Sequence, residues 1–283
     1  MNLLNKNTLL VLCMFLFSQL FGQESKIENY KKWKYVSELL TAVQDSGVVL
    51  LRIQDFENGK NYIKRNYESS TYNLYINKID KYNRVLKEDV SKGFTFSKIY
   101  VFNSKLSKHI LNDEFEKIEF INPKNGNVNP IDQSTPHIFA QIKSLKLSGN
   151  SNPLNFSYQR LIQVLDRDLQ KHKDIDLQQD FFYHSNVKGK DRCTHIFEAA
   201  QKMSKSFEEL LVLSKKKQKR LKKQIKAKHV AKIEEFKKKI NTMLKIKEGS
   251  ITNQHRSRLN NEIEKFRNEI NKIELIEKQL FEL

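Results

Sequence analysis

Cysteine is scarce in this chain of 283 residues, which contains only Cys13 and Cys193. Cys13 lies in an N-terminal segment that we expect to be removed, which would leave Cys193 alone. A single thiol cannot form an internal disulfide, so the disulfide-stabilised scaffolds of small secreted proteins are excluded. We expect Cys193 to be a buried, inert thiol, and a bond between two copies of the chain is the alternative.

Recognisable catalytic and metal-binding motifs are absent as well. The sequence contains no glycine-rich phosphate loop, no GxSxG elbow, no HExxH motif and no CxxC pair. Cys193 and His195 are close in sequence, but a metal site needs at least one further ligand, and we assign both a structural role. We therefore predict no cofactor, no metal and no catalytic residue, although an enzyme without a known motif is not excluded.

Glycine and proline are few, with 8 and 4 residues, while 39% of the chain is apolar and 10% is aromatic. This composition predicts a packed core rather than a disordered chain.

The N-terminus has the layout of a signal peptide. Lys6 precedes an apolar run from Leu9 to Phe17, and Gly22 supplies a small residue for cleavage. The run is shorter than the roughly 20 residues that a membrane span needs. We therefore expect cleavage near Gly22 and an exported protein, in the periplasm, in the cell envelope or secreted. An uncleaved anchor is one alternative, because Leu20 is not small, and a lipoprotein modified at Cys13 is another.

Positive charge is concentrated in one stretch of the chain. The formal net charge is +18, and residues 214–247 hold 15 basic and 2 acidic side chains. Such a stretch attracts polyanions, and export favours an anionic envelope component over genomic nucleic acid. The alternative is a solvated helix face whose charge is partly offset by Glu262, Glu264, Glu269, Glu274 and Glu277. The candidate polyanion-binding residues are Lys215, Lys216, Lys217, Lys219, Arg220, Lys222 and Lys223.

Hydrophobic periodicity predicts an α/β domain in the first two thirds of the chain. Apolar residues in 26–43 and 59–90 recur every three or four positions and predict helices. Residues 48–53 and 94–102 predict strands, and a strand–helix–strand unit favours parallel pairing. Weaker patterns predict a helical turn near 106–111 and strands at 118–121, 137–147 and 161–166.

The last third predicts two long amphipathic helices around Gly249, in an antiparallel, coiled-coil-like hairpin. The second helix is shorter, so residues 196–211 of the first must bury their apolar face on the α/β domain or on another chain. The predicted organisation is a signal peptide at 1–22, an α/β domain at 23–192 with a mixed or mostly parallel sheet and flanking helices, and a basic helical hairpin at 193–283.

Four segments occur in an order that resembles a set of uncharacterised exported bacterial α/β proteins. Residues 47–52 resemble their GVLLVRL strand, 94–102 their FxFxxVYFF strand and 180–183 their PFPYY element, with 161–166 between the last two. The last block departs, because Asp180 and Phe182 stand where prolines are expected. The resemblance covers residues 35–210, implies a single α/β domain and implies no activity.

These features favour an exported binding protein or envelope-associated structural protein. Its C-terminal helices would take a protein partner or a second copy of the chain, and its basic run would take an anionic envelope component. One alternative is a polyanion-binding surface protein. Another is an enzyme whose active site lies at the carboxyl ends of the parallel strands, near 53–56 or 103–104.

Overall fold

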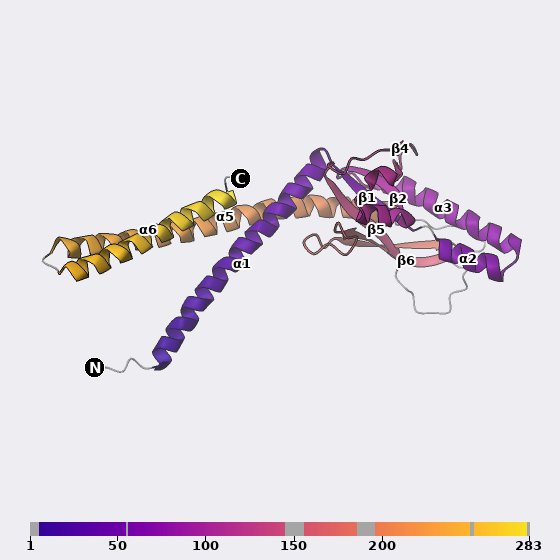
Figure 1. Ribbon diagram of the computed structural model, residues 1–283. Coiled ribbons are helices and arrows are strands. Elements are labelled where there is room, and N and C mark those ends of the chain that lie inside the picture. Colours follow the sequence, from indigo (N-terminus) through magenta and orange to yellow (C-terminus); the bar gives the residue numbers. More distant parts are fainter. Residues whose placement is uncertain (1–5, 55, 145–155, 186–195, 250–251, 282–283) are drawn as a thin grey trace. The chain divides into compact units, whose positions relative to one another are not determined.

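The structure is a computed structural model that describes residues 6–54, 56–144, 156–185, 196–249 and 252–281 (Figure 1). The chain divides into two compact units. Val36–Leu213 form the first, here called the α/β unit, and Met1–Tyr35 with Ser214–Leu283 form the second, the helical unit. The helices α1 (Lys6–Asp45) and α5 (Ile196–Glu248) contribute residues to both. The domain limits expected from the sequence stay a prediction, and Cys193 and His195 lie outside the described residues.

A seven-stranded sheet forms the centre of the α/β unit, in the order β4-β3-β2-β1-β5-β6-β7. β1 lies parallel to β2 and to β5, and the other neighbouring strands are antiparallel, so the predicted mixed sheet is confirmed. The helices α2 (Glu57–Asn66) and α3 (Ser69–Gly93) connect β1 to β2. The strands are β1 (Val48–Ile53), β2 (Lys98–Asn103), β3 (Phe120–Ile121), β4 (Val128–Asn129), β5 (His137–Ser144), β6 (Phe156–Leu165) and β7 (Gln178–Ser185).

The first face of the sheet carries the larger core. Val49, Leu51 and Ile53 of β1 point to it, because successive side chains of a strand alternate between faces. Residues from the end of α1, from α3 and from the start of α5 belong to the same buried cluster. Phe207 of α5 is only 1% exposed, and its ring stacks on Phe96 with centroids 5.1 Å apart. Of the two surfaces expected for the proximal part of this helix, the α/β domain or another chain, its apolar face packs on the α/β unit.

The second face of the sheet is covered by the segment between β2 and β5. Leu50 of β1 and Phe139 of β5 point to this face and belong to a cluster with Ile110 and Phe115. Ile110 lies on the short helix α4 (Ser107–Leu111), where a helical turn was expected, and Phe115 begins the 3₁₀ helix η2 (Phe115–Lys117). Another 3₁₀ helix, η1 (Ser104–Leu106), precedes α4. The sheet is thus buried between helices on one side and a mostly irregular layer on the other.

The helical unit contains α5 from Ser214 onward, α6 (Asn253–Phe281) and the part of α1 that ends at Tyr35. Figure 1 shows α5 and α6 side by side. Ile225 of α5 and Leu280 of α6 pack with Tyr30 of α1 in one buried cluster. Farther along, His229 Nδ1 lies 2.9 Å from Glu277 Oε1, and the rings of Phe236 and Phe266 are 5.3 Å apart. These contacts join α5 to α6 at more than one place along the two helices.

Several elements differ from the sequence expectation. The single helix expected over 59–90 is divided into α2 and α3 by Tyr67 and Glu68, whose backbones are extended. No glycine or proline marks that break. The strand expected over 94–102 begins only at Lys98, because Phe94 and Phe96 pack against Phe207 instead. The strands β4 and β7 were not expected.

Candidate functional site

The basic run expected to bind polyanions lies on α5, within the helical unit. Ser214, Ile225 and His229 are buried and mark the inward face of the helix. With 3.6 residues per turn, most of the basic side chains fall on the opposite half. Five of them are exposed there and form what we call the basic strip: Lys215, Lys216, Lys219, Arg220 and Lys223.

The other two basic residues of the run contact aromatic rings of the helical unit. Lys217 Nζ lies 4.1 Å from the centroid of the Trp33 ring, and Lys222 Nζ lies 4.9 Å from that of Phe281. Such contacts combine cation–π attraction with coverage of apolar surface by the lysine stem. Lys217 and Lys222 are therefore partly engaged within the protein.

No carboxylate of the described residues forms an ion pair with the basic strip. Among the described residues, none of the seven basic side chains between 215 and 223 forms an ion pair. The described α6 carboxylates thus form no ion pair with residues 215–223, although the charge of Lys232, farther along α5, adds to the hydrogen bond from Lys272 in lowering the pKa of Glu269. Three of the five α6 carboxylates named for it have partners elsewhere: Glu264 with Arg267, Glu269 with Lys272 and Glu277 with His229.

Positive charge also extends beyond the strip, toward α1. Burial, together with repulsion from Lys26 and Lys232, lowers the pKa of Lys228. Burial is the larger cause of this shift, and the two lysines add positive charge near the Lys228 side chain. An approaching anion would relieve this repulsion.

The second candidate position, at the carboxyl ends of the parallel strands, holds a half-buried arginine. Arg52 precedes the last residue of β1. It is two residues after the buried Leu50 and therefore points to the same, second face of the sheet. Arg52 Nη1 donates to Ser107 Oγ at 3.4 Å, and Arg52 Nη2 donates to Gln141 Oε1. Burial lowers the pKa of Arg52, but a guanidinium stays protonated in proteins. A full positive charge therefore lies beside a hydrophobic core.

Two glutamines extend this polar row across the sheet. Arg52 pairs with Gln141 of β5, and Gln141 pairs with Gln163 of β6, so the three side chains lie in line on one face. Gln141 Nε2 donates to Gln163 Oε1 at 3.4 Å. Gln163 is only 8% exposed. The row thus continues from the half-buried guanidinium to a buried amide.

The turn that follows β1 is held in a strained conformation. Phe56 adopts a left-handed backbone with φ 60° and ψ 15°, which is costly for a bulky side chain. Its ring is buried and meets the ring of Tyr82 edge-on at 5.8 Å. Packing against α3 therefore fixes the chain at Phe56, four residues beyond Arg52.

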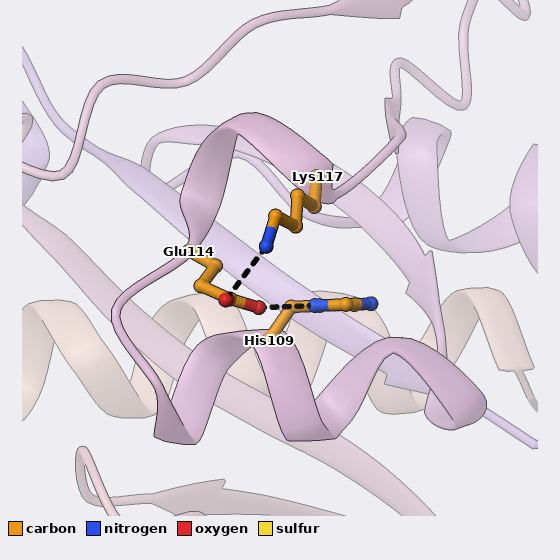
Figure 2. A network of polar contacts seen from close by, with 3 residues as sticks. All are labelled: His109, Glu114 and Lys117. Atoms are coloured by element: carbon orange, nitrogen blue, oxygen red, sulfur yellow. Dashed lines mark hydrogen bonds and ion pairs between the residues drawn. The ribbon is translucent and has the colours of Figure 1, made fainter.

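Ser107, the hydroxyl partner of Arg52, is positioned by α4, and a polar network fastens the end of that helix. Figure 2 shows Glu114 between two basic side chains. His109 Nδ1 lies 2.6 Å from Glu114 Oε2, and Lys117 Nζ donates to Glu114 Oε1 at 2.7 Å. The hydrogen bonds from Lys117 and His109 lower the pKa of Glu114, which keeps it ionised. These three side chains satisfy one another, and we assign them a structural role.

Histidines at other positions of the α/β unit are also used by the fold. His137 packs between the rings of Phe115 and Phe139, at 5.2 and 4.9 Å. His172 is buried, and its Nδ1 accepts hydrogen bonds from the backbone N–H groups of Asp174 and Ile175, each at 3.1 Å. Within the described residues, no three side chains of the metal-binding types lie together.

Comparison of the chain with family models, curated proteins and solved structures returns no match. Among the residues that the structure describes, no helix combines the length and the apolar character that crossing a membrane requires.

Sequence reasoning named the carboxyl ends of the strands but missed Arg52 as the residue of interest. Its partner Gln141 is 89 positions away and Gln163, the next residue of the row, is 111 positions away, and only the strand register brings the three together. One signal was available in the sequence. A single charged residue inside the otherwise aliphatic run 48–53 is unusual for a buried strand.

Proposed function

We propose that the protein is an exported binding protein whose helical unit attaches to an anionic polymer of the cell envelope through the basic strip. The observation that carries this proposal is a row of five exposed cations on one helix face without a carboxylate partner among the described residues. Uncompensated charge of this kind attracts polyanions over distances of about a Debye length.

In this proposal α5 and α6 form an antiparallel, coiled-coil-like hairpin that presents the strip. The pairs Ile225–Leu280, His229–Glu277 and Phe236–Phe266 support it. The strip itself lies on the N-terminal side of Ile225, beyond these pairs. There the helix gains support from α1, because Lys217 lies over Trp33.

Export is part of the same proposal. Cleavage near Gly22 would leave in the mature chain Tyr30 and Trp33, two α1 side chains that contact α5 and α6. The contacts of the helical unit are therefore compatible with removal of the segment 1–22. Sequencing the N-terminus of the mature protein tests this step, with Gln23 as the expected first residue.

An enzyme at the carboxyl ends of the strands has less support. Arg52 offers a positive charge that can hold an anion, and Gln141 and Gln163 offer amides. None of these is a nucleophile or a general base at neutral pH. The position is therefore better suited to binding than to catalysis.

Binding to a heparin matrix tests the polyanion proposal. A variant with Lys215, Lys216, Lys219 and Lys223 changed to Gln should elute at a much lower salt concentration. With roughly 0.2–1 kcal/mol for each of the four exposed charge pairs, its affinity should fall by between about fourfold and several hundredfold at 0.15 M salt.

A matched variant provides the control for that experiment. Changing Lys237, Lys238, Lys245 and Lys247 to Gln removes the same charge from the distal part of α5, where Glu234, Glu235 and Glu248 already dilute it. The salt concentration at which this control variant elutes should fall much less. Equal effects of the two variants, or no retention of the unmodified protein, would contradict the proposal.

A further inference from the structure

We infer that the α/β unit binds a small oxyanion, the carboxylate or phosphate group of a small molecule, at Arg52 on the second face of the sheet. This site is separate from the basic strip, which belongs to the other unit. The inference depends on the strand register and on the hydrogen bonds of Arg52, and not on the polyanion proposal.

The guanidinium has no opposite charge among the described residues. Its two hydrogen-bond acceptors, Ser107 Oγ and Gln141 Oε1, are both neutral, and among the described residues it forms no further hydrogen bond or ion pair. Taking a charge out of water costs free energy unless an opposite charge or a full set of hydrogen bonds offsets the loss. A bound anion would supply what the protein lacks.

The guanidinium also has donors to spare. Of its five N–H groups, the two described hydrogen bonds occupy two. The remaining three lie in the plane of the group, and a planar fork of this kind matches two oxygens of a carboxylate or phosphate. No described residue accepts from Gln163 Nε2. This amide therefore offers a further donor in the same row.

The surroundings keep the arginine in place for a ligand. Gln141 Oε1 and Ser107 Oγ hold two of its nitrogen atoms from β5 and α4, and the network of His109, Glu114 and Lys117 fastens the corner that follows Ser107 (Figure 2). A side chain fixed in this way loses little conformational freedom when it binds. The position also fits the general rule that open α/β sheets bind ligands at the carboxyl ends of their parallel strands.

Isothermal titration with sodium oxalate and with sodium phosphate, in 0.15 M NaCl at pH 7, tests the inference. The protein should be the Lys215, Lys216, Lys219 and Lys223 to Gln variant, so that anions on the basic strip do not contribute. Binding of either probe is expected, and the probe that binds more tightly identifies the ligand as a carboxylate or as a phosphate.

Substitutions at Arg52 assign the binding to the arginine. In that background, Arg52→Gln and Arg52→Met should weaken the affinity by about tenfold or more, because a hydrogen bond to a charged group contributes roughly 1.5–3 kcal/mol. Arg52→Lys keeps the charge but not the planar fork of donors, so its affinity for the anion should lie between those of the parent and of Arg52→Gln. Arg65→Gln removes an exposed arginine of α2 and should leave the titration unchanged.

Stability without added anion separates a binding site from a structural one. Arg52→Met should leave the thermal unfolding temperature unchanged or raise it, since it removes a poorly compensated charge. The inference is overturned if neither probe binds, or if Arg52→Met binds them as tightly as its parent. Asp55 follows Arg52 by three residues in the sequence and is the carboxylate that could pair with it instead of a ligand. The inference is therefore also overturned if Asp55→Asn lowers the unfolding temperature and neither oxalate nor phosphate raises it.

Discussion

Lys217 and Trp33 are in direct contact, with the ammonium nitrogen 4.1 Å from the ring centroid. The pair joins a residue of the basic run to the part of α1 that belongs to the helical unit. Its neighbour Lys216 is exposed and belongs to the basic strip. Adjacent lysines of α5 therefore serve different purposes, one in stability and the other in the proposed binding.

Substitution of these two lysines should separate stability from binding. Lys217→Gln should lower the free energy of unfolding by about 0.5–1 kcal/mol, the usual contribution of a cation–π contact at an exposed site. Lys216→Gln should leave it unchanged within about 0.5 kcal/mol but should weaken retention on heparin more than Lys217→Gln does. Urea unfolding and heparin elution measure the two effects. Identical behaviour of the variants would contradict the division of roles.

Truncation of Phe207 should destabilise the α/β unit strongly. Its ring is 1% exposed and meets the rings of Phe94 and Phe96 at 6.0 and 5.1 Å. Phe207→Ala should therefore cost about 3–5 kcal/mol, as expected for a fully buried aromatic side chain. Phe197→Ala, on the same helix but 37% exposed, is the matched control and should cost much less. Chemical denaturation compares them, and similar losses would count against this docking of α5.

A methyl group at Gly93 should disturb the contact between α3 and α5. An added Cβ would lie 2.5 Å from the carbonyl oxygen of Phe197 and 2.9 Å from Ala200 Cβ, both too short for an undisturbed backbone. Gly93→Ala should therefore lower the free energy of unfolding by about 1–3 kcal/mol, although alanine favours helices. Lys92→Ala, one residue earlier and exposed, should change it by less than about 0.5 kcal/mol. Stabilisation by Gly93→Ala would refute the close approach.

The stability of the α/β unit should depend on pH through His137. Burial and the charge of Arg167 lower the pKa of His137. The hydrogen bond with the Thr135 carbonyl raises it, but the net shift is downward. The unfolded chain then binds a proton at His137 at a higher pH than the folded protein does. The contribution of His137 to the free energy of unfolding is therefore complete above its ordinary pKa of 6.5, and it is lost as the pH falls toward the lower pKa of the folded protein.

The measurement for His137 is the free energy of unfolding between pH 7.5 and 4.5. His137→Phe keeps an aromatic ring beside Phe115 and Phe139 and should show a shallower decline with falling pH. The difference between the two proteins should not exceed about 1.4 kcal/mol per pH unit, the limit for one proton. Parallel curves would show that another group causes the decline.

The strands β1 and β2, their parallel pairing and the two long C-terminal helices were predictable because their signals are local. The aliphatic run 48–53 and the helical spacing after Thr194 need no information from elsewhere in the chain. The break at Tyr67 was not predictable, since neither glycine nor proline marks it. Phe94 and Phe96 alternate as in a strand, but they pack against Phe207 more than 100 residues away.

Of the two candidate sites, the basic strip could be predicted from the sequence and the Arg52 row could not. The basic strip was predictable, because charge on a helix follows directly from the order of residues. That Lys217 and Lys222 lie over aromatic rings was not, because Trp33 and Phe281 come from opposite ends of the chain. The Arg52 row needed the register of three strands, which no local pattern contains.

The contact between His229 and Glu277 has a consequence for how α5 and α6 choose their alignment. Apolar side chains can pack against one another in several alignments of two helices. A buried imidazole keeps its carboxylate partner in only one of them. Sliding α6 by one heptad would bring Ile270 to the place of Glu277 and leave the imidazole facing an aliphatic chain. In the proposed hairpin, a single polar contact inside an apolar seam would therefore select one register among several that hydrophobic packing alone would tolerate.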